Sequence, residues 1–433
     1  MPVSASIQII SNHPEERLIR LLADAGHKAH PIAPDTVSGD MVADFPDKPD
    51  VLFFCPSEAE DLSLPPALAA DCPPLITIGG TTLDEQAHSL PRNFTDIELL
   101  ERLSSLLRLQ TMKEEFTRRK RTLGQYGLKE TALDLPDREM GKARILLIGD
   151  RADLLGDILL RLENKAQPHI CRIAATAPQQ LRENHFDGVV ILGVAPGDSH
   201  LRLVNDLRAD SRLFSLPVVF VLEHESNREA AYVHGASDAV VTPNEMDSLF
   251  PRLSLHIQLS RYRRTLQTLL RIATPLRVAD GPSGLYSFGF MQAHLGRMIK
   301  DHKARNRYLS VASLHLSNLD DLNTAYGYPA GDQVLRQTGS LLSTLLRGED
   351  FCCRHSGGRF IIAMPHTMEQ SARTALDRIC SVARHTEFSV FGHDGPVLPI
   401  FTPGLAEMKP DDTLESLLER SLPPLSASRD AAE

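Results

Sequence analysis

The chain has 433 residues, of which 42% are hydrophobic and 24% are charged, and this composition is typical of a globular protein of about two to four domains. Its formal net charge of −10 argues against a general binder of nucleic acid or anionic membranes, although a local arginine cluster could hold a small anionic ligand. No run of about 18 apolar residues occurs, so we expect no membrane span and a cytoplasmic location.

The six cysteines include no C-x-x-C pair, so free, buried thiols are expected. Cys352 and Cys353 are adjacent in a predicted strand, and their side chains should therefore point to opposite faces of a sheet. Together with His355 they match no familiar zinc spacing, and we expect no metal site.

Before residue 281, one β–α pattern runs twice along the chain. SIQIISNHPEERLIRLLADAGHKA, from Ser6, corresponds to ARILLIGDRADLLGDILLRLENKA, from Ala143, and later apolar segments correspond in the same order. Short apolar strands that alternate with amphipathic helices predict an α/β fold with doubly wound parallel sheets. We therefore expect one such domain with its linker at 1–140, and a second, with a long coupling helix, at 141–280.

The order of these elements resembles the CheY-like receiver domains of bacterial response regulators. The resemblance implies an acidic pair after the first strand and a phosphoacceptor Asp after the third, where Mg²⁺ helps to neutralise a phosphoryl group. The acceptor position holds Cys55 in the first copy and Leu192 in the second. Neither side chain can form an aspartyl phosphate, so we expect degenerate receivers that act as docking modules. The acidic-pair positions hold Ser11 and Asn12 in the first copy, and Gly149 and Asp150 in the second.

Further along, FCCRHS and RFIIAMP flank Gly357 and Gly358 and predict a β-hairpin with a tight turn. This hairpin, together with LNTAYGYPAGDQVLRQ from Leu322, resembles the GGDEF family of diguanylate cyclases over roughly residues 283–425. The resemblance implies an α+β, nucleotidyl-cyclase-like domain, which we place at 281–433. The whole chain then resembles the receiver–receiver–GGDEF response regulators.

Members of this family condense GTP with two metals held by two carboxylates, because the metals bridge the triphosphate and activate the attacking hydroxyl. At the two carboxylate positions this chain has His315 and Gly358. The resemblance therefore implies a degenerate active site without catalytic Mg²⁺ or another cofactor, and we expect no enzyme activity. The remaining positions of that site are Asn323, Asp332, Ser356, Gly357 and Arg359.

Asn323 and Asp332 stand where the family reads guanine, and an amide and a carboxylate can hydrogen-bond to the edge of that base. They leave open a site that binds GTP without turnover. The alternative is that both residues only cap or turn the local helices.

The family also binds its product, cyclic di-GMP, at an R-x-x-D motif that ends five residues before the hairpin motif. Arg347 and Asp350 have that register, and Arg378 falls at the spacing of a further family arginine. Guanidinium groups can contact guanine and phosphate in bidentate fashion, and a carboxylate can accept from guanine N–H groups. Arg144 matches a position from which the family's second receiver contacts the same ligand. The alternative for Arg347 and Asp350 is a surface ion pair of little energy.

We therefore expect a non-catalytic cyclic di-GMP receptor whose ligand controls a protein–protein interaction, with no nucleic-acid partner. Resemblance to a catalytically inactive member of the group further implies a cell-cycle adaptor for regulated proteolysis, located at a cell pole, whose partners are a protease or a cell-cycle regulator. The long helix that ends the second copy is a natural coupling or dimerisation element, and it leaves a homodimer open. The alternatives are a diguanylate cyclase with altered metal ligands and a nucleotide-independent scaffold.

Overall fold

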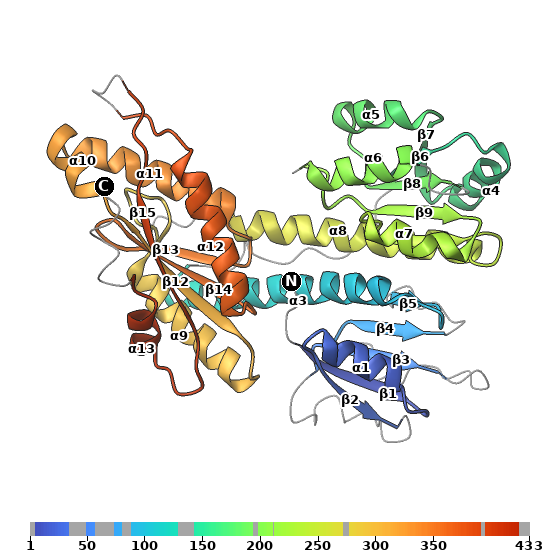
Figure 1. The fold of residues 1–433 in the computed structure, drawn as a ribbon, viewed down its shortest axis with the longest axis horizontal. Coiled ribbons are helices and arrows are strands. Elements are labelled where there is room, and N and C mark those ends of the chain that lie inside the picture. Colours follow the sequence, from blue (N-terminus) through green and yellow to red (C-terminus); the bar gives the residue numbers. More distant parts are fainter. Residues whose placement is uncertain are drawn as a thin grey trace.

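The computed structural model describes residues 5–33, 49–56, 73–79, 88–128, 143–193, 198–210, 212–271, 277–390 and 395–423. They form three units, each built on a five-stranded sheet, and two long helices run between the units (Figure 1). Cys72 and the expected boundary between residues 140 and 141 lie outside the described residues. The five described cysteines are buried and free, as predicted.

The first unit is a parallel sheet with the order β2-β1-β3-β4-β5. Its strands are short, and the central strand β3 is apolar and buried along its whole length, as expected for a sheet covered on both faces. The element bounds are β1 Ser6–Ser11, α1 Glu16–Asp24, β2 Lys28–Ile32, β3 Val51–Cys55, β4 Leu75–Ile78 and β5 His88–Leu90.

The second unit repeats this topology, with the order β10-β9-β8-β6-β7 and parallel pairing throughout. When the strands of each unit are counted from its own first strand, both sheets have the order 2-1-3-4-5, which is the flavodoxin-like order. The predicted repeat of a doubly wound sheet is therefore confirmed. The bounds are β6 Ala143–Ile148, α4 Ala152–Leu162, β7 Ala166–Cys171, α5 Ala177–Glu183, β8 Gly188–Leu192, α6 Asp198–Ala209, β9 Val218–Leu222, α7 Arg228–Val233 and β10 Asp238–Val241.

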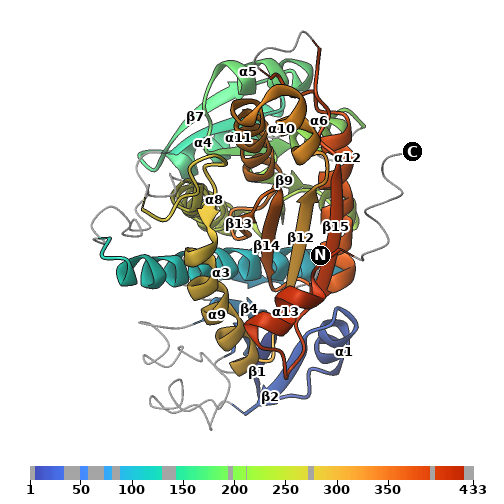
Figure 2. The same ribbon diagram turned by 90° about the vertical axis from the view of Figure 1, so that its left-hand side faces the viewer.

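The third unit differs, because its sheet is mainly antiparallel, with the order β11-β13-β14-β12-β15. The predicted hairpin is confirmed as β13 and β14, and Cys352 and Cys353 belong to the hydrophobic clusters on opposite faces of the sheet. The bounds are β11 Tyr286–Ser287, α9 Phe288–Ala304, β12 Leu309–Leu316, α10 Leu319–Tyr326, α11 Tyr328–Leu345, β13 Phe351–Ser356, β14 Arg359–Pro365, α12 Glu369–Arg384, β15 Phe401–Glu407 and α13 Leu414–Arg420 (Figure 2).

The two long helices, α3 Asp96–Gln125 and α8 Leu249–Arg271, lie side by side and together reach the third unit (Figure 1). Thr95 is the N-cap residue of helix α3, and its side chain accepts from the Glu98 backbone N–H at 3.3 Å. An apolar seam holds the pair together: Leu109, Met112, Phe116, Tyr262, Leu266 and Leu270. We call this pair of helices the stalk. No described helix is long and apolar enough to cross a membrane.

Buried charges fix the stalk to the second unit. The Asp238 carboxylate, at the start of β10, accepts from Arg102 Nη2 of α3 at 2.9 Å, from His256 Nε2 of α8 at 3.0 Å, and from Arg252. The cationic neighbours Arg102 and Arg252 hold the pKa of Asp238 well below its usual range, although burial acts in the other direction. These contacts join α3, which follows the first sheet, to the second unit.

A second buried cluster fixes α3 to the third unit. Glu115 of α3 is fully buried and accepts from Arg118 at 2.6 Å, from Arg119 at 2.7 Å and from His294 Nε2 of α9 at 2.9 Å. A buried carboxylate with this many donors is stable only while all of them stay in place. The third unit is thus docked on α3 by specific polar contacts as well as by apolar packing.

Candidate functional site

The residues expected at the acidic-pair and acceptor positions lie at the carboxyl ends of neighbouring parallel strands. Ser11, at the end of β1, pairs in register with Cys55, at the end of β3. Cys55 is 5% exposed, and burial raises the pKa of its thiol to about 12, so the thiol stays protonated and is a poor nucleophile.

In the second unit, Leu192 ends β8 and belongs to the hydrophobic core. A Cβ atom on Gly149 would lie 2.8 Å from Leu192 Cβ, so the leucine side chain occupies the space next to the end of β6. Asp150, the one acidic residue at these positions, is exposed. Apolar packing therefore fills the place where the resemblance implies a phosphoacceptor.

In the third unit, the hairpin tip and β12 place His315 opposite Arg359 in the antiparallel ladder. Burial and the Arg359 charge lower the pKa of His315, so its ring is neutral near pH 7. A Cβ atom on Gly358 would lie 2.6 Å from the Leu316 carbonyl oxygen, which is closer than such contacts allow. The backbone here leaves no room for a side chain at position 358. Among the described residues, no group of three or more His, Cys, Asp or Glu side chains could hold a metal ion.

The two residues expected at guanine-reading positions, Asn323 and Asp332, lie together at the junction of α10 and α11. The Asn323 amide lies against Gly331, because a Cβ atom added to Gly331 would lie 1.9 Å from Asn323 Oδ1. Asp332, the next residue after Gly331, is exposed. The structure thus brings Asn323 and Asp332 close together and leaves the Asp332 carboxylate exposed.

The residues of the R-x-x-D motif form a tight turn between α11 and β13. The Asp350 backbone N–H donates to the Arg347 carbonyl oxygen at 3.1 Å, and the Arg347 backbone N–H donates to Asp350 Oδ2 at 2.9 Å. Arg347 is exposed, and the hydrogen bond that joins it to the Asp350 carboxylate comes from its backbone N–H and not from its guanidinium. The turn instead leaves the guanidinium available to a ligand.

Asp350 is half-buried in this turn. Burial raises the pKa of its carboxyl to about 7, the nearby Glu349 carboxylate adds to the rise, and the Arg347 charge partly offsets it. This carboxyl therefore changes its protonation state around neutral pH.

Arg378 and Arg144 have different places relative to the turn. Arg378 Nη2, from α12, donates to the Leu345 carbonyl oxygen at 3.1 Å, two residues before Arg347. The Arg144 guanidinium, by contrast, lies 3.5 Å from His169 Nε2 and over the Phe186 ring, within the second unit. The structure therefore brings Arg378 to the turn and does not bring Arg144 there.

Sequence reasoning missed the stalk residues that hold the turn. Arg119 Nη2 of α3 donates to the backbone carbonyl oxygens of Gly348, at 3.2 Å, and Asp350, at 2.8 Å. Arg108, also of α3, lies 3.3 Å from Glu349 Oε1. The only signal in the sequence is the number of arginines on a long helix, which does not indicate what they contact.

A cavity of about 470 Å³ opens between the stalk, the second unit and the turn. Its lining includes Arg347 and Glu349 of the turn, Arg108 of α3 and Arg263 of α8. Volumes of this size accommodate ligands as large as nucleotides. Arg347 is thus the residue of the motif that faces a cavity shared by separate parts of the chain.

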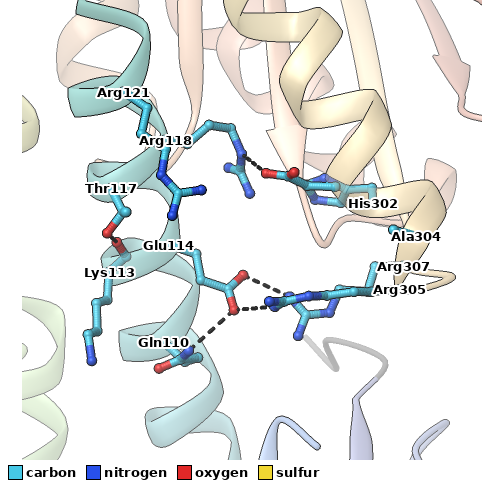
Figure 3. Close-up of a pocket in the computed structure, with 11 residues that line it drawn as sticks. Gln110, Lys113, Glu114, Thr117, Arg118, Arg121, His302, Ala304, Arg305 and Arg307 are labelled. Carbon is cyan, nitrogen blue, oxygen red and sulfur yellow. Dashed lines mark hydrogen bonds and ion pairs between the residues drawn. The ribbon is translucent and has the colours of Figure 1, made fainter. Parts of the chain in front are cut away.

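A smaller hollow, of about 290 Å³, lies between α3 and α9 (Figure 3). Glu114 accepts there from Arg305 at 2.8 Å and from Arg307 at 2.7 Å, and Arg118 donates to Asp301 at 2.9 Å (Figure 3). Arg307 also pairs with Asp50 of the first unit. These pairs join the first unit, α3 and the third unit, so we interpret this hollow as part of the docking contact.

Comparison with known proteins identifies the third unit. Residues 278–428 match the family described as "Diguanylate cyclase, GGDEF domain". This part of the chain is a GGDEF domain. The GGDEF match covers the hairpin, the guanine-reading positions and the R-x-x-D turn described above. The domain therefore has the fold that the sequence resemblance implied.

Curated relatives extend the similarity beyond the GGDEF domain. The chain is 25% identical over 341 residues to "Response regulator PleD" of Caulobacter vibrioides strain NA1000 / CB15N, which is 77% of this chain and 73% of that protein. It is 25% identical over 122 residues to "Probable diguanylate cyclase DgcC" of Escherichia coli K12, or 28% of this chain and 31% of that protein. Among solved structures, the GGDEF domain of DgcB from Caulobacter crescentus in complex with c-di-GMP is 21% identical, with a TM-score of 0.32 over 33% of this chain and 82% of that one.

Proposed function

We propose that this chain is a non-catalytic receptor for cyclic di-GMP, and that the ligand controls a protein–protein interaction. The observation that carries the proposal is the turn at Arg347 and Asp350, which leaves the Arg347 guanidinium facing a cavity between the GGDEF domain and the stalk. A ligand bound there contacts parts of the chain that belong to different units. Binding then favours one arrangement of those units over another, and with it one outer surface.

The absence of catalysis is part of the same proposal. His315 and Gly358 replace the two metal-binding carboxylates, and the space beside Leu316 O excludes a side chain at position 358. Phosphoryl transfer of this kind depends on metal ions to neutralise the triphosphate. Asn323 and Asp332 still allow GTP to bind without turnover.

We further propose that the two doubly wound units are degenerate receivers with docking roles. By its resemblance to the response regulators, the protein is a cytoplasmic adaptor, at a cell pole, that forms a homodimer and presents a cell-cycle regulator to a protease. This part of the proposal rests on the resemblance of the whole chain, and its partners are proteins rather than nucleic acids.

The test combines two assays on the full chain. Fluorescently labelled cyclic di-GMP should bind with rising anisotropy, and unlabelled cyclic di-GMP should displace it at lower concentration than GTP does. Incubation with GTP and either Mg²⁺ or Mn²⁺ should give no cyclic product on chromatography. A cyclic product would establish an enzyme, and absence of binding would leave a nucleotide-independent scaffold.

A further inference from the structure

The cavity beside Arg347 contains a carboxylate that the proposed site does not use. Glu349 is 3% exposed, and its buried Oε2 atom has no hydrogen-bond partner among the described residues, whereas Oε1 lies 3.3 Å from Arg108 Nε. A buried acceptor without a donor is unfavourable, so such an atom in a cavity wall indicates a donor supplied by a ligand or by solvent.

Arginines from both stalk helices line the same cavity. Arg263 of α8 donates through Nη2 to the Ser105 hydroxyl at 2.9 Å, and its buried Nε has no hydrogen-bond partner among the described residues. Burial and the charge of Arg108 together lower the pKa of Arg263 to about 10, despite the opposing effect of Glu349. The surroundings therefore provide little negative charge for the Arg263 guanidinium, and an anion in the cavity would be stabilised beside it.

We propose that Glu349, Arg108 and Arg263 form a second set of contacts for cyclic di-GMP. This inference rests on the proposed function and adds to Arg347, Asp350 and Arg378. Guanine carries N–H donors that suit the free Oε2 of Glu349, and phosphodiester oxygens accept from guanidinium groups. The ligand then contacts α3, α8 and the turn at the same time. The stalk is thereby part of the binding site as well as a spacer between units.

Two alternative roles for Glu349 predict opposite effects of a single substitution. If it only neutralises Arg108, Glu349→Gln removes a negative charge from the cavity and tightens the binding of an anionic ligand. If it accepts from guanine, the same substitution weakens cyclic di-GMP binding by about tenfold or more, because a charge-assisted hydrogen bond is lost. We expect the second result, and a smaller difference in affinity between cyclic di-GMP and cyclic di-AMP in the variant.

The experiment measures displacement of labelled cyclic di-GMP from the full chain and from Glu349→Gln, Arg108→Ala and Arg263→Ala, with thermal melting to establish that each variant folds. Arg264→Ala is the matched control, because Arg264 neighbours Arg263 on α8 and does not line the cavity. We expect weakening by about tenfold in each of the first three variants and unchanged affinity in the control.

The outcomes separate this inference from the proposed function. Unchanged or tighter binding in folded Glu349→Gln and Arg263→Ala, with loss in Arg347→Ala, overturns the second contact set and leaves the receptor function intact. Loss in the cavity variants with unchanged binding in Arg347→Ala supports the second contact set and overturns the R-x-x-D assignment. No binding by the unaltered chain overturns both.

Discussion

The Arg119 guanidinium donates to the backbone carbonyl oxygen of Asp350 at 2.8 Å, although the two residues are 231 positions apart in the sequence. The same guanidinium donates through Nε to Glu115 at 2.7 Å. A buried arginine with fixed partners on both sides positions the R-x-x-D turn relative to α3. The geometry of the proposed ligand site is therefore set by a helix that begins after the first sheet.

This relationship predicts the effect of a conservative change. In Arg119→Lys the positive charge next to Glu115 is kept, but one ammonium group cannot reproduce the planar set of donors to two carbonyl oxygens. We expect cyclic di-GMP affinity to fall by about tenfold, with only a modest change in melting temperature. Titration calorimetry measures the affinity. Arg121→Lys, at an exposed position of the same helix, should bind as the unaltered chain does.

The pKa of Asp350 predicts a pH dependence of ligand binding. Its pKa is raised to about 7 by burial and by Glu349, and the ionised carboxylate is the form that accepts from guanine. Affinity should therefore increase from about pH 6 to about pH 8 and level off above that range. His256 and His366, which line the cavity beside Arg347, have lowered pKa values because they are buried, so they remain neutral in this window.

Anisotropy titrations over that pH range measure the effect, and Asp350→Asn is the control. The variant should bind more weakly and show a flat profile. A profile of equal slope in Asp350→Asn would mean that another group controls the pH dependence.

The proposed lack of catalysis predicts that simple reversion does not restore it. We expect the double variant His315→Asp, Gly358→Asp to form no cyclic product from GTP, and to melt at a lower temperature, because the new Cβ atom at 358 meets the Leu316 carbonyl oxygen at 2.6 Å. Ser356→Asp adds the same charge at an exposed position of the hairpin and should leave the melting temperature nearly unchanged. Product formation on chromatography would show that the site needs only its carboxylates.

The buried charges between α3 and the second unit predict a large loss of stability. Asp238→Ala leaves Arg102 and Arg252 buried without their shared carboxylate, and breaking a buried ion pair in this way costs roughly 3–5 kcal/mol. Denaturant unfolding measures the change. Asp247→Ala, whose side chain is 95% exposed and pairs with Arg161, is the control and should unfold nearly as the unaltered chain does. Equal stability of the two variants would contradict this account of the interface.

Local sequence patterns were sufficient to predict the strands, their parallel pairing and the hairpin, because each depends on neighbouring residues. The internal repeat predicted that Cys55 and Leu192 end corresponding strands, β3 and β8. The position of Arg378 near the turn followed from spacing within one domain. Whether these units act as receivers, and whether the turn binds its ligand, stay predictions.

The contacts that surround the turn could not be predicted in the same way. Arg119 reaches the turn, and Glu349 and Arg263 line one cavity, because α3 and α8 pack side by side against the third unit, and no local pattern encodes that packing. Arg144 shows the converse: its position matched the family, but in this chain its guanidinium lies at His169 and Phe186. Positional similarity specifies a place on a strand, whereas the arrangement of units decides what that place contacts.

The measurement that tests the central proposal most directly is titration calorimetry of the full chain with cyclic di-GMP, beside Arg347→Ala. The account predicts binding in the low- or sub-micromolar range that is lost in the variant, while the melting temperature stays the same because Arg347 is exposed. Equal affinity of the two proteins, or no binding by either, would contradict it.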